Sequence, residues 1–288
     1  KNAIEYSAKA VDDCLLNKTF LKQPIPYEAV DLIIYVSSTG IATPSIDAFL
    51  INERPFQENV ERMPLWGLGC AGGAIGLSRA YDFVKAYPDK TALVISCELC
   101  GITFQHQDIR KSNIVGTALF GDGISAALLV GETSPYLEFV RQPVLKIMDK
   151  SSALKREGTH VMGWNVTNQG LQVIFSKSIP SLVGTFWKAH MEHFLRQIQC
   201  EKADITAYIA HPGGMKVLKA MEEALQDDRE KLKFSYQVLK NHGNMSSATV
   251  LYVLQEWMKS GGKIGEKGLL SALGPGFSSE LLLLEWKG

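Results

Sequence analysis

The sequence lacks a net charge, a long apolar run and a dense set of cysteines. Its 30 Lys and Arg residues balance 30 Asp and Glu residues, so no electrostatic argument favours a nucleic acid or a membrane surface as a partner. No apolar run approaches the roughly 18 residues of a membrane-spanning helix, which argues against membrane insertion. Five cysteines form an odd and sparse set, which predicts reduced thiols in the cytoplasm and argues against a disulfide framework.

Closely spaced cysteines and histidines are too few to predict a metal site. Cys97 and Cys100 form a single CxxC at the end of an expected strand over 92–96, and His190 and His193 lie three apart in an expected helix. Neither pair has further ligands at a suitable spacing. We expect the cysteines to lie in the core or in a pocket wall, the histidines to lie on a solvated helix face, and no metal to be bound.

A lone cysteine stands in the glycine-rich stretch GLGCAGGA at 67–74, before an amphipathic run over 75–87. This pattern predicts a strand, a tight turn and a helix, with Cys70 at or just before the first helical turn. A helix N-terminus favours an anion, so a thiol at that point tends to ionise. The alternative for a lone cysteine is a buried structural role.

Apolar runs and periodicity place the remaining elements. We expect helices over 1–17, 178–199, 214–225, 229–239 and 246–259, and two short helices over 45–60. We expect strands over 31–36, 92–96, 124–130, 137–147, 160–175, 204–210, 268–273 and 280–286.

The two halves of the chain, 1–135 and 136–288, repeat each other. The matching positions are Asp31, Tyr35 and Gly40 with Asp204, Tyr208 and Gly213, Gly69-Cys70 with Gly243-Asn244, and Gly121-Asp122-Gly123 with Gly274-Pro275-Gly276. Three matches in one order at a near-constant offset predict two fused βαβ-rich repeats related by a pseudo-two-fold axis, in an α/β body. In such a body Cys70 and Asn244 begin equivalent helices that face one central site.

The repeat also predicts a segment before the first residue. The second half has strand-like segments ahead of its long helix, whereas the first half starts directly with a helix. We therefore expect the N-terminal part of the first repeat, including at least one strand, to be missing here.

His211 follows the expected strand over 204–210, at the end of the strand where α/β sheets place ligands. A thiol, an imidazole and a carboxamide together suit acyl transfer. Cys70 would carry an acyl thioester, and His211 as imidazolium would lower the pKa of its thiol. His211 and Asn244 would donate to a thioester oxygen, as decarboxylative carbon–carbon bond formation requires. A cysteine protease would instead use the asparagine to orient the histidine, but the fused-repeat architecture favours the first interpretation.

Five motifs follow one another along the chain: GCAGG at 69–73, ALFGDG at 118–123, AHPGG at 210–214, GNMSSA at 243–248 and GPG at 274–276. In this order they resemble the motifs of type III polyketide synthases, the chalcone synthase-like family. The resemblance covers essentially the whole chain and implies the thiolase fold. It implies that a starter acyl-CoA is loaded, extended by decarboxylative condensation with malonyl-CoA, and cyclised to a pyrone or resorcinol. CoA thioesters would be the substrates, with no separate cofactor.

The resemblance also implies roles for individual residues. Cys70, His211 and Asn244 match the catalytic triad of the family, and Phe120 matches the phenylalanine where the CoA tunnel meets the cavity. Other residues at cavity positions are Thr103, Ser246, Trp164, Val173, Gly274 and Pro275. Thr43 falls where plant members carry a methionine that enters the partner's cavity, which implies a homodimer.

The chain departs from the plant pattern in ways that bear on the substrate. Ala71 follows the cysteine directly, as in bacterial members, and Val173 and Thr43 replace larger side chains. Fewer rings predict a longer or wider channel and a fatty acyl-CoA starter, with an alkylpyrone as one product. Trp164, at a position often held by glycine, acts against this because it fills space. The basic residues for the CoA phosphates would lie partly in the missing segment.

Two other functions fit the same residues. A ketoacyl-ACP synthase III shares the fold and the Cys, His and Asn, but it condenses once and releases a linear product. An inactive thiolase-fold protein that only binds acyl groups is the non-enzymatic alternative. The HPGG and GPG motifs and Phe120 favour the polyketide synthase.

Overall fold

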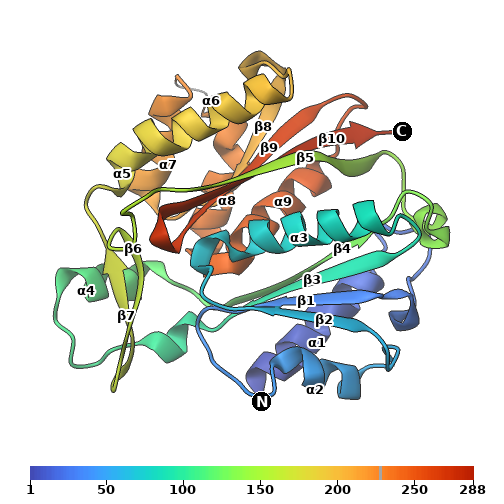
Figure 1. Ribbon diagram of the computed structural model, residues 1–288, viewed down its shortest axis with the longest axis horizontal. Coiled ribbons are helices and arrows are strands. Elements are labelled where there is room, and N and C mark those ends of the chain that lie inside the picture. Colours follow the sequence, from blue (N-terminus) through green and yellow to red (C-terminus); the bar gives the residue numbers. More distant parts are fainter. Residues whose placement is uncertain (227–228) are drawn as a thin grey trace.

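Two four-stranded sheets form the frame of the protein (Figure 1). The computed structural model describes residues 1–226 and 229–288. The first sheet has the order β2-β1-β3-β4 and the second has the order β5-β10-β9-β8. Helices cover the outer face of each sheet and fill the space between the sheets, so the body has five alternating layers of helix and sheet.

The first sheet is built around two strands whose residues are all buried. Its strands are β1 (Leu32–Val36), β2 (Glu61–Leu65), β3 (Thr91–Glu98) and β4 (Gly123–Val130). Strand β1 runs parallel to β2 and β3, whereas β4 is antiparallel to β3. Every residue of β1 and β3 is buried, as expected for strands with helices on both faces. The outer helices are α1 (Asn2–Leu15) and α2 (Ile46–Glu53), and α3 (Gly72–Ala86) covers the inner face.

The second sheet also has four strands, three of which repeat the arrangement of β1, β3 and β4. Its strands are β5 (Val144–Leu154), β8 (Ile205–Ala210), β9 (Lys267–Gly274) and β10 (Ser278–Lys287). Strand β8 is parallel to β9, which is antiparallel to β10. The helices around it are α5 (Ile179–Leu182), α6 (Lys188–Gln197), α7 (Met215–Ala224), α8 (Lys233–His242) and α9 (Thr249–Ser260). The order β1-α3-β3-β4 therefore matches β8-α9-β9-β10, which confirms the predicted pair of α/β repeats.

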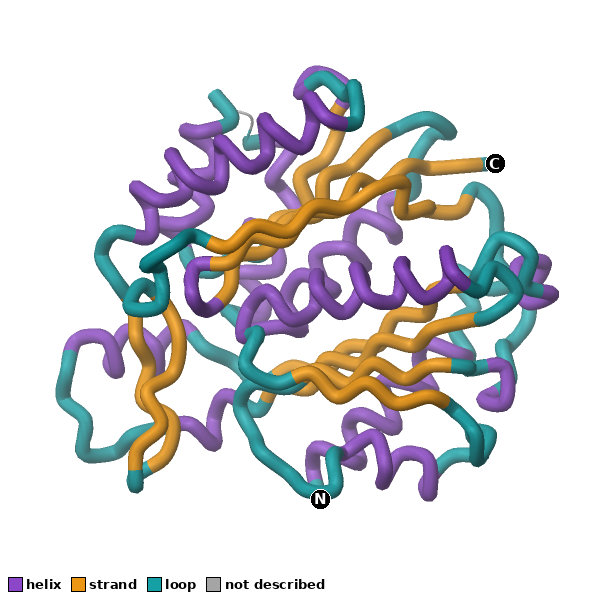
Figure 2. The backbone as a smooth tube through the Cα atoms, in the orientation of Figure 1, coloured by secondary structure: helices purple, strands orange, loops and turns teal. Residues whose placement is uncertain are grey.

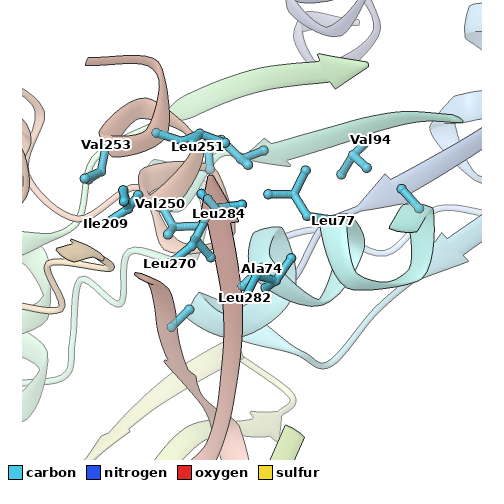
Figure 3. Packing of buried hydrophobic residues seen from close by; sticks show 14 of the residues in the cluster. Ala74, Leu77, Val94, Ile209, Val250, Leu251, Val253, Leu270, Leu282 and Leu284 are labelled. Atoms are coloured by element: carbon cyan, nitrogen blue, oxygen red, sulfur yellow. The ribbon is translucent and has the colours of Figure 1, made fainter. Parts of the chain in front are cut away.

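Helices α3 and α9 lie between the two sheets, and Figure 2 shows both in the space between the two groups of strands. Their apolar residues meet those of the inner sheet faces in one core, shown in Figure 3. Leu77 of α3 and Leu251 of α9 point into this space together with Leu282 of β10. Burying such side chains supplies roughly 1.5 to 3 kcal/mol each, so this core fixes how the two repeats sit on each other.

The beginnings of α3 and α9 approach each other more closely than any side chain would allow. A Cβ atom on Gly73 would lie 2.2 Å from the backbone oxygen of Ser247, and one on Gly72 would lie 3.1 Å from Cβ of Ser247. Only glycine fits at such a contact. The glycines after Cys70 therefore allow the two equivalent helix starts to touch.

A small lobe stands outside the two-sheet body, at the left of Figure 1. It consists of α4 (Lys111–Leu119) and a hairpin of β6 (Met162–Thr167) and β7 (Gly170–Phe175). The helix packs against β7, where Val173 lies against Gly116. This lobe belongs to neither sheet, yet it forms most of the cavity described below.

Three predicted elements differ from the structure. The strand predicted over 137–147 is a 3₁₀ turn at Pro135–Phe139 followed by β5, because Ser134 caps the turn and Pro143 delays the strand. The predicted strand over 160–175 is the hairpin β6–β7, with a turn at Asn168 and Gln169. Only α2 forms in 45–60, since the helix ends just before Pro55.

The histidine pair is only half on a solvated face, contrary to prediction. His193 is exposed, but His190 is buried and its ring nitrogens lie 2.9 Å from the hydroxyls of Ser151 and Ser279. Within residues 1–226 and 229–288, no three His, Cys, Asp or Glu side chains gather as a metal site would require. Over the same ranges, no helix combines the length and the apolar character needed to cross a membrane.

Gly73→Ala should lower the free energy of unfolding by about 1 to 3 kcal/mol, because its Cβ would overlap the Ser247 backbone oxygen and force the two helices apart. Urea denaturation measures this. Gly184→Ala is the matched control, since a Cβ there meets nothing within 4 Å. Equal midpoints for both variants would refute the tight helix contact.

His190 should make the fold sensitive to acid. Burial, helped by the charge of His193, lowers its pKa from 6.5 to about 4. The unfolded chain therefore takes up a proton between pH 6.5 and 4 that the native protein does not bind. Stability should be complete above pH 6.5 and fall by roughly 2 kcal/mol as the pH drops to 4. In urea denaturation, His190→Gln should show a flatter pH dependence than the wild type; parallel curves would contradict this assignment.

Candidate active site

Cys70 lies on a short turn that a glycine makes possible. Gly69–Ala71 form a 3₁₀ turn that runs directly into α3, and Gly69 has a φ of +48°. The Gly69 N–H donates to Oγ of Ser38 at 2.8 Å, and the ring of Pro275 occupies the space that a Cβ on Gly69 would need. The turn is thus held from both sides. It leaves Cys70 only 7% exposed at the start of the helix, as the sequence predicts.

Asn244 is fixed by its backbone and by its side chain. Its N–H donates to the Leu119 carbonyl at 2.9 Å, and its own carbonyl accepts from the Gly121 N–H at 3.0 Å. The side-chain oxygen accepts from the Ser246 N–H at 2.8 Å, and Nδ2 donates to the Gly213 carbonyl at 3.4 Å. This orientation leaves Nδ2 3.9 Å from Sγ of Cys70. Oδ1 lies at the same distance from the sulfur, so the amide can donate to Sγ through Nδ2 or accept from the thiol through Oδ1.

His211 follows the last residue of β8 and carries two unused nitrogens. Its backbone N–H donates to the Ser271 carbonyl at 2.8 Å, and the carbonyl before it accepts from Oγ of Ser235 at 2.7 Å. The side chain is 3% exposed, and neither ring nitrogen has a hydrogen-bond partner among the described residues. Buried polar groups are normally paired, so these nitrogens mark a place where a ligand group would be accepted.

Burial sets the protonation of the thiol and the imidazole. It raises the pKa of Cys70 to about 12, although the Asn244 amide opposes the shift, and it lowers the pKa of His211 to about 3. Burial therefore acts against the thiolate–imidazolium pair that the sequence predicts, because desolvation disfavours both charged forms. The sequence does not show how completely water is excluded. The ion pair stays a prediction.

A cavity of about 320 Å³ opens beside these residues, between α4, the turn Cys100–Thr103 and the hairpin β6–β7. Four residues that the sequence assigns to the substrate cavity line it: Thr103, Phe120, Trp164 and Val173. The other lining residues are Cys100, Gly101, Phe104, Asn113, Gly116, Thr117 and Leu171. Cys100 is thus in a pocket wall and Cys97 is in the core, as predicted.

Phe120 connects this cavity to the buried polar residues. Its ring lines the cavity, while its backbone forms a parallel bridge with Asn244. The ring stacks on Phe175 at a centroid distance of 5.6 Å and lies 6.0 Å from the ring of Trp164. Phe175 was not predicted as a site residue. Strand alternation could have found it, because Phe175 stands two positions after Val173 and shares its face.

The other predicted substrate residues lie around the cysteine or on the surface, outside the walls of this cavity. Ser246 is buried beside Asn244, and its carbonyl accepts from Oγ1 of Thr249. Gly274 and Pro275 pack against Ala71 and Gly69. Thr43 is on an exposed loop. A substrate role for these four stays a prediction.

A buried carboxylate below the cysteine turn was not predicted from the sequence. Glu98, at the end of β3, accepts from the Ser38 N–H at 3.0 Å, from Oγ1 of Thr39 at 2.8 Å and from Oγ of Ser247. A single acidic residue after an apolar strand gave no signal. Its position at the carboxyl end of a central strand is the one indication that the sequence offers.

Comparison with known proteins bears directly on this site. Residues 10–134 match the N-terminal domain of chalcone and stilbene synthases, and residues 148–286 match the C-terminal domain. The chain belongs to the chalcone and stilbene synthase family. It is therefore a type III polyketide synthase, an enzyme of the acyltransferase class.

Individual relatives agree with this. The synthase is 49% identical over 288 residues to a putative chalcone synthase of Bacillus subtilis (strain 168), a match that covers 100% of this chain and 79% of the relative. It is 37% identical over 265 residues to 1,3,6,8-tetrahydroxynaphthalene synthase of Streptomyces peucetius subsp. caesius, covering 89% of this chain and 67% of that protein.

Solved structures confirm the thiolase fold of the family. The crystal structure of 1,3,6,8-tetrahydroxynaphthalene synthase from Streptomyces coelicolor A3(2) superposes with a TM-score of 0.87 at 30% identity, over 99% of this chain and 77% of that one. Germicidin synthase from Streptomyces coelicolor superposes with a TM-score of 0.88 at 25% identity, over 99% of this chain and 72% of that one.

Trp164 should limit the length of the product. Its ring fills space beside Phe120, so Trp164→Gly should enlarge the cavity and shift the product mixture to longer chains, as read by mass spectrometry. Val166→Ala is the matched control, because Val166 lies on the same strand but is exposed and does not line the cavity. An unchanged product mixture from Trp164→Gly would show that the ring does not set chain length.

Proposed function

We propose that Cys70, His211 and Asn244 are the catalytic residues of this synthase. Cys70 would accept a starter acyl group from an acyl-CoA, which is then extended with malonyl-CoA and cyclised. One observation carries the proposal: Nδ2 of Asn244 lies 3.9 Å from Sγ of Cys70 and 3.4 Å from the carbonyl oxygen of Gly213, two residues after a buried histidine whose ring nitrogens are unpaired among the described residues. A thiol with an unpaired hydrogen-bond donor and acceptor nearby is suited to the transfer of an acyl group from one sulfur atom to another.

Loading starts from the neutral thiol and the neutral imidazole. As Sγ of Cys70 attacks the thioester carbonyl, its proton moves to His211, and the Sγ–acyl bond forms while the bond to the CoA sulfur breaks. His211 then returns the proton to the departing CoA thiolate. Because burial lowers the pKa of His211 to about 3, the imidazolium is short-lived and gives up its proton readily.

Extension needs hydrogen-bond donors for an enolate. In our proposal the thioester oxygen of malonyl-CoA lies between Nδ2 of Asn244 and an N–H of His211. Loss of carbon dioxide then leaves an enolate whose carbon bonds to the acyl carbon while the acyl–Sγ bond breaks, so the extended chain is on CoA and Cys70 is released as a thiolate. The hydrogen bond from the Ser246 N–H holds the oxygen of Asn244, and the NH₂ group is the donor that the amide would offer to the substrate. Such fixed donors stabilise developing negative charge without reorganisation.

Phe120 would keep water away from the reacting carboxylate. Its ring is held by Phe175 and Trp164, and its backbone is bridged to Asn244. An apolar surface at this point disfavours the charged malonyl group relative to the products, carbon dioxide and a bound enolate. The same ring would separate the entering CoA ester from the growing chain.

The walls of the cavity support an alkyl starter. They are mostly apolar, and Val173 offers a small side chain where a ring would shorten the channel. We therefore propose a fatty acyl-CoA as starter and a pyrone or resorcinol as product, with an alkylpyrone as the simplest case. Trp164 limits how far the chain extends.

A homodimer in the cytoplasm completes the proposal. Thr43 lies in an exposed loop next to Ile41, which is 73% exposed, and Ile102 beside Gly40 is 66% exposed. Exposed apolar side chains close together are typical of a surface that is covered by a partner. A second copy of the chain would cover them and bring Thr43 close to its cavity.

Three variants test the catalytic roles with acyl-CoAs from acetyl-CoA to stearoyl-CoA and with malonyl-CoA. Cys70→Ala should carry no covalent acyl group in intact-mass spectra. Asn244→Ala should still load but release carbon dioxide about 10² to 10³ times more slowly, as for a lost oxyanion donor. His211→Gln should slow both steps, because the histidine serves both.

Two outcomes would contradict these roles. A stable acyl adduct on Cys70→Ala would place the nucleophile elsewhere, and unchanged decarboxylation by Asn244→Ala would remove it from the oxyanion site. A single linear β-ketoacyl product in the wild type would exclude the proposed cyclisation.

A further inference from the structure

We propose that Glu98 is a positioning residue that holds the turn bearing Cys70 and the turn bearing Asn244 in register. The inference rests on the proposed function, since it concerns the distance between these two side chains. Glu98 touches neither of them by a hydrogen bond of its own. It acts through the backbone and hydroxyl groups that lie between.

The position of Glu98 follows from strand alternation. It is the last residue of β3, where Ala92 and Val94 face the core between the sheets, and its side chain is directed to the same face. The side chain is 0% exposed. An acidic group in such a place is costly unless all of its lone pairs have partners. Burial alone therefore does not explain why an acidic residue stands at this position.

One carboxylate oxygen of Glu98 is connected by hydrogen bonds to the turn that bears Cys70. Oε2 accepts from the Ser38 N–H at 3.0 Å, and Oγ of the same Ser38 accepts from the Gly69 N–H at 2.8 Å. Gly69 precedes Cys70 directly. A chain of two hydrogen bonds thus runs from Glu98 through Ser38 to the backbone that aims the thiol.

The other carboxylate oxygen of Glu98 is connected to the turn that bears Asn244. Oε1 accepts from the hydroxyl of Ser247, and the Ser246 N–H beside it donates to the side-chain oxygen of Asn244 at 2.8 Å. Ser247 is also the residue whose carbonyl touches Gly73 of α3. The two oxygens of one carboxylate therefore connect to the two halves of the duplicated fold.

The hydrogen-bond chemistry explains why an acid is present. The Ser38 N–H can only donate, and Oγ1 of Thr39 accepts from the Leu99 N–H at 2.9 Å, so its own proton is directed to Glu98. A glutamine at position 98 can keep these hydrogen bonds if the Ser247 hydroxyl rotates to accept from the side-chain amide of the glutamine. Glu98→Gln should therefore keep the geometry, whereas Glu98→Ala should lose both connections.

The charge of Glu98 gives a readout that geometry alone would not change. After burial, which is the main cause, the carboxylate also raises the pKa of four neighbouring groups: Cys70, Cys97, Cys100 and Tyr35. Burial raises the pKa of Glu98 itself, while its three donors oppose the shift. Glu98→Gln removes the negative charge and keeps the shape of the side chain, so it should make the Cys70 thiol easier to ionise.

The experiment compares wild type, Glu98→Gln, Glu98→Ala and Glu280→Gln. The last is a matched control, because Glu280 is a buried carboxylate on β10 that accepts from the Ser152 hydroxyl. Acyl loading of Cys70 and carbon dioxide release from malonyl-CoA are measured separately. Iodoacetamide alkylation of Cys70 is followed against pH by peptide mass spectrometry.

Glu98→Ala should slow both loading and decarboxylation by about 10²-fold, the cost of a reacting group that is misplaced by about 1 Å. Glu98→Gln should recover both rates to within about threefold, and its alkylation curve should move to lower pH. Glu280→Gln should leave rates and curve unchanged. These results together would establish a positioning role.

Three results would overturn it: a folded Glu98→Ala that loads and decarboxylates like the wild type, a Glu98→Gln as slow as Glu98→Ala, or an alkylation curve that Glu98→Gln does not move. Failure of the proposed function looks different. In that case the wild type itself would not acylate Cys70, while the alkylation curves, which need no acyl-CoA, would still report on Glu98.

Discussion

The close contact between the first turns of α3 and α9 is the constraint on which the rest of the structure depends. Gly73 of α3 lies against the backbone of Ser247, in the 3₁₀ turn Ser246–Ala248 that leads into α9, with no room for a side chain. Because Cys70 immediately precedes α3 and Asn244 precedes α9, the distance between thiol and amide is fixed by this contact. The apolar core between the sheets then holds the contact from both sides. The same contact therefore determines how the two repeats pack and how far the thiol lies from the amide.

Exclusion of water follows from this packing and shapes the chemistry. Burial raises the pKa of the Cys70 thiol and lowers the pKa of the His211 imidazole, so it favours the uncharged form of both groups. A neutral imidazole can accept a proton during acyl loading and can donate a hydrogen bond to an enolate afterwards. Water exclusion thus supports both proposed steps with one side chain.

The repeat and the positions of the three candidate catalytic residues could be predicted from the sequence, because spacing and motifs are properties of the chain itself. Cys70 and Asn244 stand at corresponding turns, and the structure brings them together as the repeat predicts. The protonation of the site could not be predicted, since it depends on burial from many directions. Glu98 and Phe175 were missed for a related reason. Each matters through neighbours far away in sequence, such as Ser247 for Glu98 and Phe120 for Phe175.

The small lobe of α4 and the hairpin β6–β7 separates two tasks within one chain. It supplies most of the cavity wall, including Trp164 and Val173, yet it contributes no strand to either large sheet. Substitutions in the lobe can therefore alter the accepted acyl chain at little cost to the stability of the two-sheet body or to the alignment of Cys70 with Asn244. This division lets new substrate preferences evolve by gradual change at the periphery, while the reacting groups stay under the strict control of the core.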